Sequence, residues 1–261
     1  MSDRKLLPGK FVWFEHMSSD TKKAQEFYGE VFGWRVKTFP MGEVGYEMIL
    51  TGDTWDSMIG GYTAPEVDRK PSHWVATVSV QDVDAAANAA VANGGKVLDA
   101  PSDLPGVGRK ARIADPQGAE LRLLTDARGD KGDAPATSGG WLWNELHTTE
   151  PTKALSFYEK VVGFSHRSMD MGPGEKYHIL SRNGVDRGGV TGHVPVGAPP
   201  HWLPYVAVDD VDATIARARK LGARIPSGPG DILGIGRFGV LEDPTGAVLA
   251  VMKPLPREKQ P

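Results

Sequence analysis

The sequence predicts an α+β protein of four βαβββ modules, and an internal repeat is the main reason. Residues of the first half return about 130 positions later: Trp13 as Trp143, Phe27-Tyr28 as Phe157-Tyr158, Gly33 as Gly163, His73-Trp74 as His201-Trp202, Asp82-Val83-Asp84 as Asp210-Val211-Asp212, and Asp115-Pro116 as Asp243-Pro244. Within each half, a strand followed by a helix begins twice. A repeat at fixed spacing indicates supersecondary units that bury their apolar faces against one another.

The length of 261 residues fits two domains, each large enough for a hydrophobic core. We place the first domain at residues 1–127, with modules near 9–64 and 72–127. A segment rich in Gly, Asp and Ser follows, and we assign residues 128–139 as a linker. The second domain then covers 140–261, with modules near 140–196 and 200–255.

The first module is expected to begin with a strand over Phe11–His16. Its apolar residues lie on both faces, as expected where a helix covers one face and the other face lines a closed interior. A helix should follow, capped within Ser18–Asp20 and ended by Gly33. Its buried stripe has helical spacing: Ala24, Phe27, Tyr28 and Val31. For the Phe-Tyr and Trp residues on the helices, core packing is the favoured interpretation.

The other modules repeat this pattern. The helix of the third module should be capped by Thr149 or Glu150, carry Pro151 in its first turn and end at Gly163. The second and fourth helices should begin at Asp82-Val83 and Asp210-Val211. Short strands are expected after each helix, for example at 97–98, 109–113 and 121–124.

Composition excludes several partners. The net charge is −3, and the Lys and Arg residues are scattered, so we expect no nucleic acid. Cysteine is absent, which excludes disulfides, thiolate zinc sites and a cysteine nucleophile. No apolar run is long enough for a signal peptide or a membrane span, so we expect no membrane association and a cytoplasmic location. A homodimer stays open.

The chain resembles the vicinal oxygen chelate superfamily, which contains glyoxalases, bleomycin-resistance proteins and extradiol dioxygenases. The resemblance lies in Phe27-Tyr28 with Phe32-Gly33-Trp34, their echo Phe157-Tyr158 with Val162-Gly163-Phe164, and the turns Asp115-Pro-Gln-Gly and Asp243-Pro-Thr-Gly. It covers nearly the whole chain and is greatest for a two-domain actinobacterial glyoxalase-like subgroup. It implies two glyoxalase-like domains with curled mixed sheets, each cupping a small-molecule cavity.

Catalytic members of that superfamily hold a divalent metal with His, Gln or Glu on the first strand of each module and a carboxylate on a late strand. By the resemblance, these positions fall on Trp13, Trp143, Val75, Leu203, Arg122 and Ala250. None of these side chains supplies an imidazole nitrogen or a carboxylate oxygen. We therefore predict no metal and no other cofactor at these positions.

At a distance of two residues from four of these positions, and on the same strand faces, the sequence has Glu15, His73, Glu145 and His201. We predict them as catalytic residues, because a His oriented by a carboxylate can act as an acid–base couple. Two alternatives stay open. His147 could complete a relocated divalent-metal site in the second half. Alternatively, the histidines donate hydrogen bonds to backbone and the glutamates pair with Arg or Lys.

The remaining expected ligand-binding residues are Trp13, Arg122, Trp143, His147, Leu203, Tyr205 and Met252. Aromatic and apolar walls with a few polar groups are typical of small-molecule pockets, and Arg122 could receive a carboxylate or phosphate. The alternative is that side chains fill the cups. The predicted function is binding of a small organic ligand without the usual metal; the alternatives are a metal-dependent or acid–base lyase, isomerase or dioxygenase of the glyoxalase type, and a drug-sequestering resistance protein.

Overall fold

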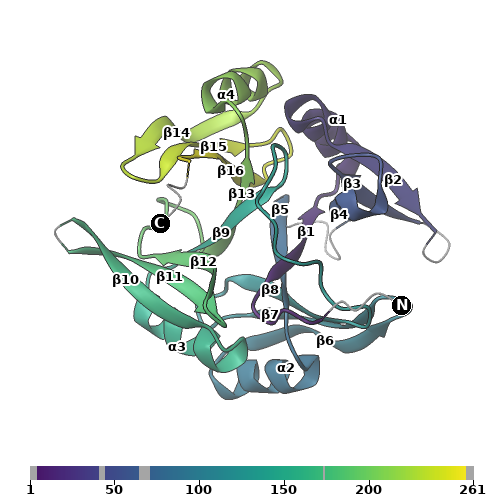
Figure 1. Cartoon of the computed structure of the whole chain (residues 1–261), viewed down its shortest axis with the longest axis vertical. Coiled ribbons are helices and arrows are strands. Elements are labelled where there is room, and N and C mark those ends of the chain that lie inside the picture. The colour runs from purple at the N-terminus through teal and green to yellow at the C-terminus, as the bar shows by residue number, and fades with distance from the viewer. Residues whose placement is uncertain (1–4, 41–44, 65–70, 173, 257–261) are drawn as a thin grey trace. The chain divides into compact units, whose positions relative to one another are not determined.

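A computed structural model describes residues 5–40, 45–64, 71–172 and 174–256 of the chain. Over these residues the order of one strand, one helix and three strands occurs four times (Figure 1). This confirms the predicted α+β class and its four βαβββ modules. No helix among them is long and apolar enough to cross a membrane.

The modules have the following elements. The first contains β1 (Phe11–Met17), α1 (Thr21–Phe32), β2 (Arg35–Phe39), β3 (Tyr46–Leu50), a 3-10 turn (Trp55–Ser57) and β4 (Met58–Thr63). The second contains β5 (His73–Ser79), α2 (Val83–Ala92), β6 (Lys96–Leu104), β7 (Gly108–Ala114) and β8 (Glu120–Asp126). The third contains β9 (Trp141–His147), α3 (Pro151–Val161), β10 (Ser165–Gly172), β11 (Glu175–Arg182) and β12 (Val185–Thr191). The fourth contains β13 (His201–Ala207), α4 (Val211–Lys220), β14 (Arg224–Ile232), β15 (Gly236–Glu242) and β16 (Val248–Pro254).

The strands form two eight-stranded sheets with the same order of modules. One sheet runs β2-β3-β4-β1-β5-β8-β7-β6, and the other runs β10-β11-β12-β9-β13-β16-β15-β14. Both are mixed, because β5 pairs with β8, β12 with β9 and β13 with β16 in parallel, whereas the hairpins are antiparallel. The predicted mixed sheets are therefore confirmed.

The helix ends follow from local chemistry. Asp20 caps α1 by accepting a hydrogen bond from the Lys23 amide at 3.1 Å, and Gly33 ends the helix in the left-handed conformation with φ of 72°. Asp82 and Asp210 cap α2 and α4 in the same way. Glu150 is the N-cap of α3 but makes no side-chain cap bond.

The described residues group into two compact units by contact. Most of the second and third modules lies in one, which consists of residues up to Phe14 with Val75–Ala134 and Trp143–Leu203, so that the first strand of each module is divided between the units. Most of the first and fourth modules lies in the other, which consists of Glu15–Trp74, Pro135–Leu142 and the chain from Pro204. We call these the inner and outer units, after the place of their modules along the chain. Helix α2 packs on α3 in the inner unit, and α1 packs on α4 in the outer unit (Figure 1). The domain boundaries at 1–127 and 140–261, which follow the order of the sequence, stay a prediction.

The predicted linker is held by side-chain bonds in the inner unit. The Asp130 carboxylate accepts hydrogen bonds from the Leu7 amide and the Ser79 hydroxyl, at 2.5 and 2.6 Å. Asp133 accepts two from Arg187, at 2.6 and 3.0 Å. The aspartates that contribute to a composition typical of a flexible linker therefore also hold this segment in place by accepting hydrogen bonds.

Three of the repeated motifs meet in the core of the inner unit. Tyr158 of the Phe-Tyr pair donates a hydrogen bond to Asp115 of the Asp-Pro turn at 3.2 Å. Trp202 of the His-Trp pair donates to the Tyr158 hydroxyl at 3.0 Å. All three side chains are buried. The motifs therefore join module three to modules two and four, and the predicted core packing of Tyr158 on its helix is confirmed.

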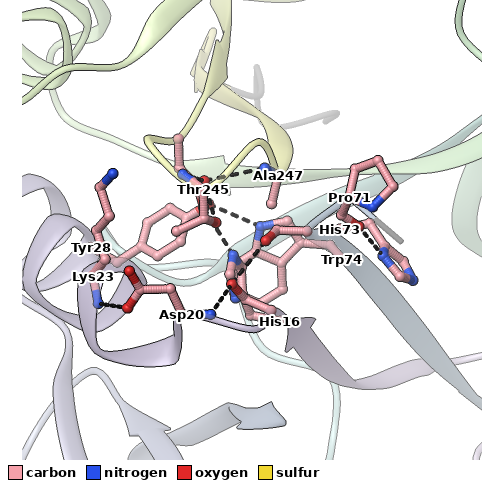
Figure 2. Close-up of polar contacts among 12 residues, drawn as sticks. His16, Asp20, Lys23, Tyr28, Pro71, His73, Trp74, Thr245 and Ala247 are labelled. Carbon is pink, nitrogen blue, oxygen red and sulfur yellow. Dashed lines mark hydrogen bonds and ion pairs between the residues drawn. The ribbon is translucent and has the colours of Figure 1, made fainter. Parts of the chain in front are cut away.

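The outer unit contains the equivalent network with one added member (Figure 2). Trp74 donates to the Tyr28 hydroxyl at 3.1 Å, and Tyr28 hydrogen-bonds the Asp243 carboxylate. His16 reaches the same carboxylate with Nε2 at 2.8 Å. The corresponding residue of the inner unit is the apolar Leu146. Modules one and four are therefore joined by a buried pair of ionisable groups.

Candidate functional site

The second half of the chain brings three predicted side chains together in the inner unit. Nε2 of His147 lies 2.9 Å from Oε1 of Glu145, close enough for an ion pair but without hydrogen-bond alignment. The imidazoles of His147 and His201 are stacked, with ring centroids 5.0 Å apart and planes at 10°. The end of β9 and the start of β13 thus place one carboxylate and two imidazoles in a single cluster, which we call the Glu-His-His cluster.

Backbone bonds set the tautomers of both imidazoles. Nδ1 of His201 lies 2.8 Å from the carbonyl oxygen of Pro199, and Nδ1 of His147 lies 2.7 Å from that of His193. A carbonyl oxygen only accepts hydrogen bonds, so each Nδ1 carries the proton. In the neutral form of each ring, Nε2 then carries the lone pair and can accept a proton.

Burial lowers the pKa of the His201 imidazole, and the neighbouring His147 lowers it further. The bond to Pro199 and the Glu145 carboxylate oppose this shift. His201 therefore has a lone pair on Nε2 at neutral pH, which is the form a general base needs.

Sequence reasoning missed Tyr177, which shares the sheet face of this cluster. Tyr177 is in register with Thr191, and Thr191 with His147. The Trp143 indole donates to the Tyr177 hydroxyl at 2.8 Å. Residues in direct register share a face, so Tyr177 and Trp143 form an aromatic border beside the cluster.

A glycine makes room for this phenol. A Cβ atom on Gly189 would lie 1.8 Å from the Tyr177 hydroxyl oxygen, and Gly189 is the register partner of Glu145. The first half has the same arrangement, since a Cβ on Gly61 would lie 2.1 Å from the Tyr46 hydroxyl. The repeat of Tyr46 and Gly61 as Tyr177 and Gly189 was the signal in the sequence that could have identified these residues.

The first half differs in its ionisable groups. Glu15 is buried and accepts a hydrogen bond from the Tyr46 hydroxyl at 2.8 Å. Nδ1 of His73 lies 2.9 Å from the Pro71 carbonyl, as His201 does from Pro199 (Figure 2). Met17 occupies the place that corresponds to His147. The outer unit therefore contains Glu15 and His73, but not the second imidazole at this position.

The structure also places the remaining predicted residues. Leu203, Tyr205 and Met252 are buried on β13 and β16, so protein atoms cover most of their surface. Trp13 and Arg122 are half-buried on β1 and β8. Burial lowers the pKa of Arg122 to about 10. The ligand-binding roles of these residues stay a prediction.

Two hollows among the described residues lie between helices, and neither is lined by residues of the Glu-His-His cluster. One of about 260 Å³ lies in the inner unit between α2 and the end of α3, bordered by Lys160 and Arg182. Another of about 390 Å³ lies in the outer unit between the end of α1 and α4, bordered by Arg217. Both are shallow spaces where helices meet.

The side chains at the positions implied for a metal do not fit one. Indoles, aliphatic groups and a guanidinium stand there, and Arg122 brings positive charge where a carboxylate ligand would be needed. Within the described part of the chain, no three His, Asp or Glu side chains are placed to hold one ion.

The module order, the mixed sheets and the half-buried polar clusters on first strands define a tandem βαβββ protein. The sequence model of the Glyoxalase/Bleomycin resistance protein/Dioxygenase superfamily matches residues 10–123 and 143–251. The chain belongs to this superfamily, and the resemblance noted from its motifs is confirmed.

Relatives and solved structures agree with this assignment. The chain is 36% identical over 248 residues to "Putative glyoxylase CFP32" of Mycobacterium tuberculosis, covering 94% of this chain and 95% of the relative. It is 27% identical over 267 residues to "Anthracycline biosynthesis protein DnrV" of Streptomyces peucetius, covering 95% and 94%. A Mn(II)-bound glyoxalase from Novosphingobium aromaticivorans has a TM-score of 0.66 at 20% identity, covering 94% of this chain and 82% of that one. The 2,3-dioxygenase LapB from Pseudomonas sp. KL28 has the same TM-score at 13% identity, covering 100% and 97%. These two structures share the fold.

Proposed function

We propose that this chain binds a small organic ligand and transfers a proton on it at the Glu-His-His cluster, without a metal at the superfamily's usual positions. The observation that carries the proposal is the meeting of Glu145, His147 and His201 within one compact unit. A neutral imidazole and an imidazole beside a carboxylate are the two partners that general acid–base catalysis requires.

We assign the following roles as part of the proposal. His201, whose pKa is lowered by burial, takes a proton from the ligand onto Nε2. His147, when protonated on both ring nitrogens, supplies the proton of Nε2, and the Glu145 carboxylate 2.9 Å away stabilises the positive charge of that ring. A proton leaves one ligand atom and another arrives at a second atom, so the net reaction is an isomerisation. Both imidazoles then return to their starting forms by exchange with water.

The ligand class is proposed from the surroundings and the relatives. Trp143 and Tyr177 offer aromatic surface beside the cluster, which favours a planar ligand. One relative is named for anthracycline biosynthesis and another as a glyoxylase. We therefore propose an oxygen-rich ligand with a carbonyl group next to the carbon or oxygen that loses its proton.

The test measures exchange of carbon-bound hydrogen in D2O by proton NMR, with the adduct of methylglyoxal and 2-mercaptoethanol as the probe. Binding of alizarin, a planar hydroxyquinone, is followed in parallel by its absorbance. We expect enzyme-dependent exchange that falls at least about a hundredfold in Glu145→Gln and His201→Asn, since general acid–base groups contribute roughly 10² to 10⁴ in rate. The matched controls are Glu175→Gln and His166→Asn, which change exposed residues.

Equal exchange in the wild type and in both cluster variants would remove the acid–base assignment. Binding of alizarin without exchange of the adduct would instead support a binding protein. In that case the ligand should raise the thermal midpoint, because it binds only the folded state.

A further inference from the structure

The hollow between α2 and α3 in the inner unit recurs at the equivalent place of the outer unit. By the internal repeat, Val80 and Gly163 of the inner hollow correspond to Val208 and Gly33 of the outer one. In each unit the hollow lies where the C-terminal end of one helix meets the N-terminal half of another. The two hollows are therefore one position of the repeat with two different sets of side chains.

The two hollows differ in charge. Lys160, in the last turn of α3, borders the inner hollow, and Glu30 stands at the equivalent place of the outer one. Gln81 of the inner hollow likewise corresponds to Asp209 of the outer one. Arg182 adds a second cation to the inner hollow. Because the same fold accepts a glutamate in the last turn of α1, a cation at the end of α3 is not a requirement of the fold.

The Arg182 guanidinium is held in place by the end of α3. Its Nη1 donates a hydrogen bond to the Gly163 carbonyl, and its stem packs on Gly9, where an added Cβ would lie 2.9 Å from the Arg182 Cβ. Among the residues that the structure describes, neither Arg182 nor Lys160 forms an ion pair with a carboxylate. The carboxylate of Asp82, which also borders the hollow, caps α2 instead by accepting a backbone hydrogen bond at 3.0 Å.

The wall of the inner hollow on α2 is made of small apolar residues, which are Ala85, Ala86 and Ala89. In the outer hollow, Thr214 corresponds to Ala86 and Arg217 to Ala89, so this wall is polar there. A cationic rim beside an apolar wall matches an anion that has an apolar body. The volume of about 260 Å³ suits a ligand smaller than a typical drug.

We propose that the hollow of the inner unit binds a small organic carboxylate. The carboxylate group pairs with Lys160 and Arg182, and the apolar body of the ligand lies on the alanines of α2. Because Arg182 is already held by the backbone, little further freedom is lost when it binds the anion. The site contains no residue of the Glu-His-His cluster, so the proposal goes beyond the proposed proton transfer and does not rest on it.

The test is isothermal titration of the full chain with sodium benzoate, with benzamide as a neutral isostere and inorganic phosphate as an anion without an apolar body. We expect benzoate to bind with a dissociation constant of about 1 mM or below, and the other two at least about tenfold more weakly. Lys160→Glu gives the inner hollow the residue of the outer one, and it should weaken benzoate binding about tenfold or more, because attraction becomes repulsion. Lys220→Glu makes the same change in the last turn of α4, at a place that borders neither hollow, and should bind benzoate as the wild type.

A second variant narrows the hollow without changing its charge. Ala85 is exposed on α2, so Ala85→Leu leaves the core intact and should weaken benzoate binding about tenfold by occupying the space of the ligand. Asn88→Leu, at an exposed place on the same helix that does not border the hollow, is the matched control. The thermal midpoint of each variant shows that it is folded.

Three outcomes would overturn the proposal. They are a wild type that does not bind benzoate, an affinity unchanged in both Lys160→Glu and Ala85→Leu, and binding of benzamide or phosphate as tight as that of benzoate. Glu145→Gln should bind benzoate as the wild type does, so that failure of this proposal and failure of the proton-transfer proposal are distinguishable.

Discussion

His16 and Asp243 form a buried pair in the outer unit, with Nε2 of the imidazole 2.8 Å from Oδ2 of the carboxylate and neither side chain exposed. Burial acts to raise the pKa of Asp243, but the hydrogen bond from His16 and its charge outweigh it, so the pKa is lowered. The equivalent Asp115 of the inner unit has Leu146 in place of His16. Burial raises the pKa of Asp115, against the opposing backbone hydrogen bonds of its turn. The same repeated turn therefore contains two aspartates with opposite shifts.

Replacement of these two aspartates should have unequal effects. Asp243, whose pKa is lowered, contributes stability above its unfolded pKa of about 3.9, and this is lost as the pH falls through the folded value. Asp243→Asn should lower the free energy of unfolding by about 3 kcal/mol at pH 7, because it leaves His16 buried without its partner. Urea unfolding followed by tryptophan fluorescence measures this.

Asp115→Asn is the matched control. The folded state binds the proton of Asp115 more tightly than the unfolded state does, so its carboxylate lowers stability as the pH rises above about 3.9. An amide keeps the acceptor oxygen of the turn, so the change at pH 7 should stay within about 1 kcal/mol. An equal loss in both variants would contradict the role assigned to His16.

His201 should make the inner unit sensitive to mild acid. Its folded pKa is lowered, so the unfolded state binds more protons as the pH falls below about 6.5, and stability declines there. His201→Asn should flatten the dependence of the unfolding free energy between about pH 7 and 5. A slope identical to that of the wild type would show that His201 titrates normally.

His147 should add to the lowering of the pKa that burial produces in His201. His147 contributes to the lowered pKa of His201, and the first half has Met17 at the corresponding place. His147→Met should therefore raise the pKa of His201 toward its ordinary value, as measured by NMR titration of the imidazole. His166→Asn serves as the control, and a shift in the opposite direction in His147→Met would argue against the stacked pair.

Gly189 should tolerate no side chain while Tyr177 is present. The added Cβ would lie 1.8 Å from the phenol oxygen, so Gly189→Ala should lower the free energy of unfolding by about 1–3 kcal/mol, a usual cost of overpacking. Gly192→Ala is the control, since its Cβ would meet Pro151 at 3.4 Å. Combining Gly189→Ala with Tyr177→Ala should recover part of the loss. No recovery in this double variant would mean that another contact excludes the methyl group.

The sequence by itself determined the modules and their elements. The helical spacing around Phe27-Tyr28 predicted α1, and Asp20 and Gly33 predicted where it begins and ends. This was possible because helix periodicity and capping depend on residues that are neighbours in the sequence. The alternation of faces along a strand likewise predicted Glu145 and His201 as a pair, since each lies two residues from a position at which the superfamily holds its metal. Local patterns carry this information without knowledge of distant contacts.

Only the tertiary structure decided how the modules pair. That Asp243 meets His16 and Tyr28, 200 and more residues away in the chain, depends on the packing of module four on module one and on no local pattern. The same holds for Tyr177, which lies beside Trp143 because Gly189 leaves space. Burial also lowers the pKa of His201 and of Arg122, and this effect follows from the tertiary structure because desolvation depends on the atoms that surround a group rather than on its neighbours in sequence.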